Sequence, residues 1–114
     1  MMNMLIQIDE AQIIKERKYR LDDVWRVLNA RFDRYGCIKE RQEDGSMLYK
    51  GNPEKDYFTC MMLAAIQLKH QKWFGRYCTK WILYDNDDDE ELPFQDIDIL
   101  SRERQKNPLF QQDK

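Results

Sequence analysis

The chain has 114 residues, of which 42% are hydrophobic and 35% are charged, and its formal net charge is −2. This length suits one domain, and the hydrophobic content with a small net charge argues against an intrinsically disordered protein. No apolar run reaches the roughly 20 residues of a membrane span, and the first ten residues lack the pattern of a secretory signal. We therefore expect a single globular domain over residues 1–114, with a flexible acidic loop at 85–91 and a flexible tail at 106–114.

The first predicted elements are a short strand at Met4–Ile8 and a short helix that Asp9 caps. A longer helix is predicted over 21–35, because its apolar side chains recur at three- and four-residue steps. Gly36 follows this helix and is a typical residue at a helix C-terminus. The spacing predicts an amphipathic helix that packs against a core on one side.

A β-hairpin is predicted over residues 37–51. The dipeptide Asp44-Gly45 is typical of a two-residue turn, because both residues tolerate positive φ. In that register Glu40 lies opposite Tyr49. The strands are polar, so we expect one face of this small sheet to contact water.

The second half of the chain predicts mainly helices. Asparagine, proline and glutamate at 52–54 predict the start of a central helix, 53–71, whose apolar side chains on nearly all sides indicate burial of most of its faces. The spacing of the rings in segment 73–84 indicates a helix, whereas its last residues also suit a strand. We favour the helix. A final helix is predicted over 94–105.

These elements predict an α+β fold that is dominated by helices, with a small antiparallel hairpin packed against them. The alternative depends on the end of segment 73–84. If these residues form a strand, the element order becomes β-α-β-β-α-β, which is the ferredoxin-like arrangement.

The cysteines and the histidine do not predict a disulfide scaffold or a metal site. Cys37, Cys60 and Cys78 are odd in number and widely spaced, and His70 is the single histidine. We therefore expect reduced thiols in a cytoplasmic protein, with no metal. The glycine motifs that bind phosphate groups do not occur in the sequence, so we expect no nucleotide cofactor.

Residues that suit catalysis are few. A cysteine–histidine pair would combine His70 with Cys60 or Cys78, and Glu40 is the one carboxylate that we consider as a general acid. The simpler interpretation is a solvent-facing histidine with small buried thiols. We therefore expect that the protein is not an enzyme.

Charged residues are segregated along the second half of the chain. Residues 66–84 carry four cations and no acid, whereas 85–98 carry eight acids and no base. The tract Asp85–Glu91 resembles a calcium-binding loop, but it lacks the glycine and the final glutamate that such a loop needs. We favour a solvated acidic loop.

Aromatic and basic side chains are interleaved over 73–84, a mixture that is enriched at protein interfaces. The alternative is that most of these rings fill the core. The residues predicted to bind a partner are Trp73, Arg76, Tyr77, Lys80 and Trp81.

We expect a small cytoplasmic accessory or regulatory protein that binds another protein, and a homodimer through the same surface is a further expectation. Nucleic-acid binding is the second hypothesis. It assigns phosphate contacts to Lys69, Lys72, Arg76 and Lys80, with Trp73 or Tyr77 stacking on bases. The apolar tail 108–110 is expected to dock internally or in a groove of a partner. No membrane contact is expected.

Overall fold

The N-terminal strand is the central strand of a five-stranded antiparallel sheet. In the computed structural model, which describes residues 1–86 and 91–111, the strand order is β2-β3-β1-β4-β5. The strands are β1 (Met2–Ile8), β2 (Ile38–Arg41), β3 (Met47–Lys50), β4 (Cys78–Asp85) and β5 (Gln95–Asp98). The helices are α1 (Glu10–Glu16), α2 (Leu21–Asp33), α3 (Tyr57–Lys69), α4 (Lys72–Tyr77) and α5 (Ile99–Lys106), followed by the 3-10 turn η1 (Pro108–Phe110).

The fold is a small mixed α+β domain, and its first four strands have the ferredoxin-like order. Strand β1 lies between β3 and β4, and β2 pairs with the outer edge of β3. This arrangement depends on segment 73–84. The prediction that this segment forms a single helix is wrong. The chain leaves α4 after Tyr77 and enters β4, whose alternating burial fits the end of that segment.

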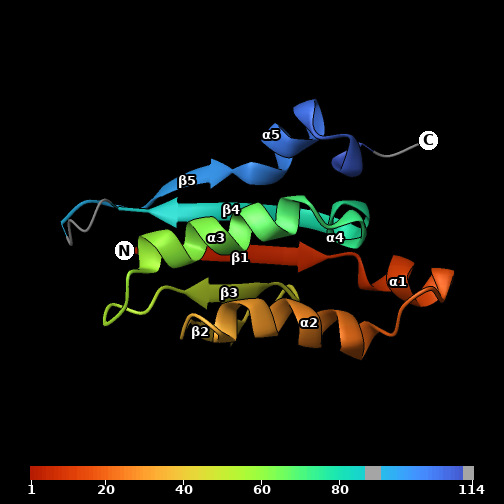
Figure 1. Cartoon of the computed structure of the whole chain (residues 1–114), viewed down its shortest axis with the longest axis horizontal. Coiled ribbons are helices and arrows are strands. Elements are labelled where there is room, and N and C mark those ends of the chain that lie inside the picture. Colours follow the sequence, from red (N-terminus) through yellow and green to blue (C-terminus); the bar gives the residue numbers. More distant parts are fainter. Residues whose placement is uncertain (87–90, 112–114) are drawn as a thin grey trace.

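Helices α2 and α3 pack side by side on one face of the sheet (Figure 1). Strand β1 alternates in burial along its whole length, and Met4 and Ile6 point to the helix-covered face. On that face Phe32 of α2 stacks on Tyr49 of β3, with ring centroids 3.9 Å apart. The core therefore lies between one layer of helices and one face of the sheet.

The hairpin forms, but its register differs from the predicted one by one residue. Three residues, 43–45, make the loop, and Gly45 has a φ of +87° at its end. This is the three-residue hairpin geometry rather than the two-residue one. Glu40 therefore lies opposite Leu48, and Lys39 lies opposite Tyr49.

The central helix begins later than predicted. Asp56 caps α3 by accepting a hydrogen bond from the Thr59 amide, at 3.1 Å. The expected cap, Asn52, instead closes a turn and accepts from the Glu54 amide. The expectation of burial on most faces is also wrong, because α3 exposes large apolar side chains on its outward side.

The predicted helix over 94–105 is wrong for its first residues. Residues 95–98 form the edge strand β5, which pairs with β4. Helix α5 starts only after Asp98, whose carboxylate accepts from the Ser101 amide at 3.0 Å. The hairpin with β4 places these residues beside a strand, and this long-range pairing overrides their local helical spacing.

The C-terminal segment docks internally. Phe110 is buried and stacks on Trp81, with ring centroids 5.9 Å apart. Gly75 lets this segment approach α4, since a Cβ atom there would lie 2.2 Å from the Leu109 carbonyl oxygen. Of the two segments expected to be flexible, the tail is therefore packed through residue 110, and positions 87–90 of the acidic loop lie outside the described residues.

None of the described helices has both the length and the apolar character that a bilayer span requires.

Candidate partner-binding site

The five residues predicted to bind a partner do not share a surface. Trp81 and Tyr77 are fully buried, and Trp73 is partly buried. Arg76 is exposed at the end of α4, whereas Lys80 lies on the face of the sheet opposite the helices. Side chains alternate between the two faces along β4, so neighbours in the sequence there are separated in space.

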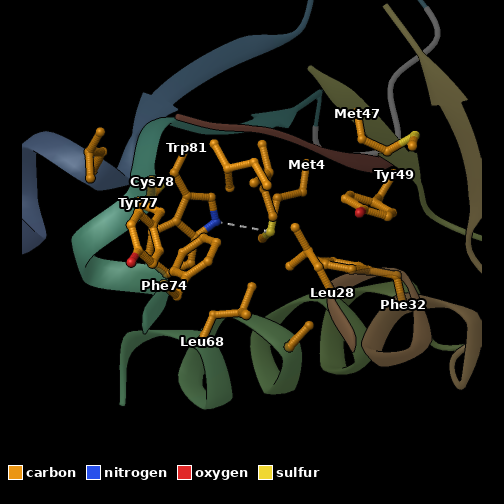
Figure 2. Close-up of a cluster of buried hydrophobic side chains, with 14 of the residues drawn as sticks. Met4, Leu28, Phe32, Met47, Tyr49, Leu68, Phe74, Tyr77, Cys78 and Trp81 are labelled. Atoms are coloured by element: carbon orange, nitrogen blue, oxygen red, sulfur yellow. Dashed lines mark hydrogen bonds between the residues drawn. The ribbon is translucent and has the colours of Figure 1, made fainter. Parts of the chain in front are cut away.

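Trp81 is a core residue. Its ring packs edge-to-face on Phe74 (Figure 2) and stacks on Phe110. Its indole Nε1 donates to the Met4 sulfur, 3.1 Å away. The alternative interpretation, that most rings of segment 73–84 fill the core, is confirmed for these rings.

Two of the four cations predicted to contact phosphate groups make ion pairs with carboxylates. Arg76 Nε lies 2.8 Å from an oxygen of Glu16, and Lys80 Nζ lies 3.3 Å from Asp44. The Ser46 hydroxyl and amide donate to Asp44, and with Lys80 they lower the pKa of that carboxyl to about 2. The two cations are therefore neutralised by different partners on different faces.

The Glu16 carboxylate joins α1 to α4. It accepts hydrogen bonds from the Arg76 guanidinium, from the Tyr77 hydroxyl at 2.6 Å and from Gln12 Nε2 at 2.6 Å. These donors, Arg76 first, hold the pKa of Glu16 well below its usual range. Because Glu16 is the last residue of α1, this network fixes the position at which the following loop begins.

The loop after α1 carries three exposed side chains, Lys18, Tyr19 and Arg20. Arg17 ends the helix in the left-handed conformation, with a φ of 56°, and so turns the chain away from the helix axis. The Tyr19 ring then meets the buried Tyr77 ring edge-to-face, with centroids 6.2 Å apart. Tyr77 is therefore not part of the exposed surface, but its ring packs against Tyr19 and holds it in position.

A hollow of about 340 Å³ lies between this loop, α2 and the start of α4. We call it the Trp73 groove, and it is lined by Lys18, Tyr19, Arg20, Asp23, Val24, Val27 and Trp73. The side chain of Trp73 is held edge-to-face against Phe74, with centroids 5.8 Å apart. Two aromatic rings, Tyr19 and Trp73, and two valines therefore contribute apolar surface to the groove, and each ring packs on a buried ring.

The rim of the Trp73 groove is positively charged. Lys18 and Arg20 are exposed, and neither makes an ion pair within the described part of the chain. Asp23 is the carboxylate at the rim, and it pairs with Arg26 at 3.0 Å. Apolar surface beside two unpaired cations suits an apolar side chain flanked by carboxylates.

Of the five residues predicted to bind a partner, Trp73 alone lines the groove, and the loop after α1 was not among the predicted residues. The missing signal is a tyrosine inside the basic run from Lys15 to Arg20. That run contains the same mixture of ring and cations as segment 73–84.

Two of the residues considered for catalysis, Cys78 and Glu40, have pKa values shifted in the direction opposite to the one that catalysis needs. Burial raises the pKa of the Cys37 thiol to about 11 and that of Cys78 to about 12. Both thiols are therefore protonated at neutral pH, which makes them poor nucleophiles. Glu40 lies 2.7 Å from the Lys50 ammonium, which lowers the pKa of the carboxyl, whereas a general acid needs a raised pKa.

A second hollow, of about 290 Å³, lies on the open face of the sheet. Leu5, Leu48 and Tyr84 contribute to it from three neighbouring strands, and Phe94 reaches it from the segment before β5. Asn3 Oδ1 is buried here without a hydrogen-bond partner.

Among the described residues, no group of histidine, cysteine and acidic side chains is arranged to hold a metal ion.

Comparisons of the chain with protein-family models, with curated proteins and with solved structures find no match.

Proposed function

We propose that this protein is a small accessory protein that binds an acidic segment of another protein in the Trp73 groove. The observation that carries the proposal is the apolar hollow beside Trp73 with the unpaired cations Lys18 and Arg20 at its rim. An apolar anchor in a pocket supplies most of the affinity at many interfaces, and rim charges supply rate and specificity.

The partner segment is expected to insert one aromatic or aliphatic side chain between Tyr19 and Trp73. Its flanking carboxylates then approach Lys18 and Arg20. Both rings are held by edge-to-face contacts with buried rings, so little side-chain freedom is lost on binding. We place this activity in the cytoplasm, where free thiols such as those of the three cysteines stay reduced. No catalytic step is assigned to the protein.

Nucleic-acid binding has less support. The predicted basic stripe needed Arg76 and Lys80 on one phosphate-binding surface, but each is paired with a carboxylate. They also lie on separate surfaces. A phosphate backbone would therefore have to displace two existing ion pairs before making new ones.

Selection from a displayed library of random peptides tests the proposal. We expect enrichment of peptides that combine one large apolar residue with aspartate or glutamate on either side. Binding of a selected peptide should weaken by about tenfold or more in Trp73→Ala, since aromatic anchors in pockets are typical hot spots. Lys18→Glu with Arg20→Glu should weaken binding further and reverse its salt dependence, because salt then screens a repulsion.

Ile14→Ala is the matched control, because Ile14 is an exposed apolar residue outside the groove lining. It should leave peptide binding unchanged. Enrichment of peptides without acidic residues, or equal binding by the Trp73→Ala variant, would contradict the proposal. So would tight binding of single-stranded oligonucleotides with a steep dependence on salt, which would favour the nucleic-acid hypothesis.

A further inference from the structure

Helix α3 exposes an apolar surface that no other described element covers. The surface, which we call the α3 stripe, consists of Phe58, Met62, Leu63 and Ile66. The exposed fractions are 56% for Phe58, 42% for Leu63 and 48% for Ile66, whereas Met62 is partly buried. In a soluble domain, a helix that packs on a sheet normally directs polar residues outward.

The stripe lies directly opposite the side of α3 that contacts the core. Met61, Ala64 and Leu68 face inward and are fully buried. At about 100° per residue, Ile66 points away from this buried side and the other stripe residues flank it. Figure 1 shows α3 on the outer side of the sheet, beside α2 and not beneath it. The exposed apolar side chains thus extend along about two turns of the helix, with the exposed Thr59 among them.

The two ends of the stripe carry opposite charge. Glu54 and Asp56 are exposed before its first turn, and Lys69 and Lys72 lie at its other end. Lys55 stands between these two acids in the sequence, and the Cδ and Cε atoms of its side chain lie beside Gly36. The patch is therefore apolar in the middle, acidic at one end and basic at the other.

We propose that the α3 stripe binds the α3 stripe of a second copy of this chain, with the two helices antiparallel. A two-fold axis places each surface against itself, so the acidic end of one copy meets the basic end of the other. The antiparallel order also sets opposite ends of the two helix dipoles side by side. This surface is separate from the Trp73 groove, and the inference stands independently of the proposed function.

The arrangement predicts which side chains meet. Met62 lies midway along the stripe, so the two-fold axis passes beside it. Phe58 and Ile66 lie four residues, or about 6 Å, on either side. Phe58 of one copy therefore packs against Ile66 of the other, and this contact occurs twice in the dimer.

Sedimentation equilibrium over a range of concentrations tests the proposal. We expect the native chain to pass from monomer to dimer, and Ile66→Glu alone to raise the dissociation constant by about tenfold or more. Phe58→Lys alone should do the same. In the double variant, lysine at 58 faces glutamate at 66 of the second copy, so the dimer should recover much of its affinity.

Ile14→Glu is the control, because it adds the same charge at an exposed isoleucine on α1. It should dimerise as the native chain does, and circular dichroism of every variant should match the native spectrum. A native chain that stays monomeric throughout the series overturns the proposal. Dimerisation that Ile66→Glu leaves unchanged overturns it as well, and failure of the double variant to recover rules out the antiparallel pairing.

Discussion

Helices α2 and α3 have the same length, 13 residues, and pack on the same face of the same sheet, yet they differ in what they show to solvent. Most apolar residues of α2 lie on one side, where Leu28 and Phe32 are fully buried, and Val27 is the exposed exception. On α3 the inward side is equally buried, but the outward side is apolar as well. Burial on one side of a helix does not explain apolar residues on the other.

A two-layer domain covers only one side of each helix. The sheet buries one face of α2 and one face of α3, and a third layer would be needed to cover their outward faces. Helix α2 has the amphipathic pattern that suits two layers. Helix α3 has the composition of a helix between two layers, which is why we assign its second layer to another copy of the chain.

The largest expected effect is on the free energy of unfolding, which should differ between substitutions at a buried leucine of α2 and at an exposed leucine of α3. Leu28→Ala should lower the free energy of unfolding by about 2–5 kcal/mol, because it leaves a cavity in a packed core. Leu63→Ala should change the stability of the monomer by about 0.5 kcal/mol or less. Urea unfolding at low protein concentration measures both. Equal losses in the two variants would show that α3 has no distinct outward side.

The second expectation concerns the C-terminal segment. It covers the end of α3, where Asn107 Nδ2 donates to the Lys69 carbonyl at 2.8 Å, and it also packs on Gly75 of α4. Gly75→Ala should destabilise the protein by about 1–3 kcal/mol, since the new Cβ atom would overlap the Leu109 backbone. Helix propensity alone predicts the opposite sign, a gain of about 1 kcal/mol. Thermal unfolding therefore decides by sign, and a stabilised variant would show that η1 does not pack on α4.

The third expectation concerns the contact between α1 and α4. This contact includes an ion pair, whereas α2 and α3 contact the sheet through apolar side chains. The folded-state pKa of Glu16 is lowered, so its stabilising effect is present above the ordinary carboxyl pKa of about 4.3 and is lost as pH falls below it. Glu16→Gln should therefore be less stable than the native chain at pH 7, and the difference should shrink in acid. Glu43→Gln, on the exposed hairpin loop, serves as the control.

A difference between native protein and Glu16→Gln that stays constant from pH 7 to pH 3 would contradict this assignment. Chemical denaturation at each pH provides the measurement. The control variant should follow the native curve throughout, because Glu43 makes no hydrogen bond or ion pair in the described part of the chain.

Local patterns predicted the elements that local interactions determine. The spacing of apolar residues located α2 to within two residues of its end, and Asp9 was correctly identified as the cap of α1. The order of strands was accessible only as an alternative, because it depends on whether the end of segment 73–84 pairs with β1. That pairing joins residues about 75 positions apart, and no local pattern reports it.

The candidate site was harder to predict than the fold. Trp73, Tyr77 and Trp81 were assigned to one surface because aromatic and basic residues are interleaved over 73–84. The change from α4 to β4 rotates Trp81 into the core. The α3 stripe could not be predicted from composition, since an apolar helix has the same sequence whether one or both of its sides are covered.

The most direct test compares the solvent contact of the two helices in the native chain. A neutral paramagnetic co-solute broadens the methyl resonances that it can reach, and the methyl groups of Ile66 on α3 and Val27 on α2 are both exposed in a single copy. We expect both to be broadened in dilute solution. At high protein concentration Ile66 should become protected, while Val27 should stay broadened. Equal broadening of Ile66 and Val27 at every concentration would contradict the claim that the α3 stripe is covered by a second copy.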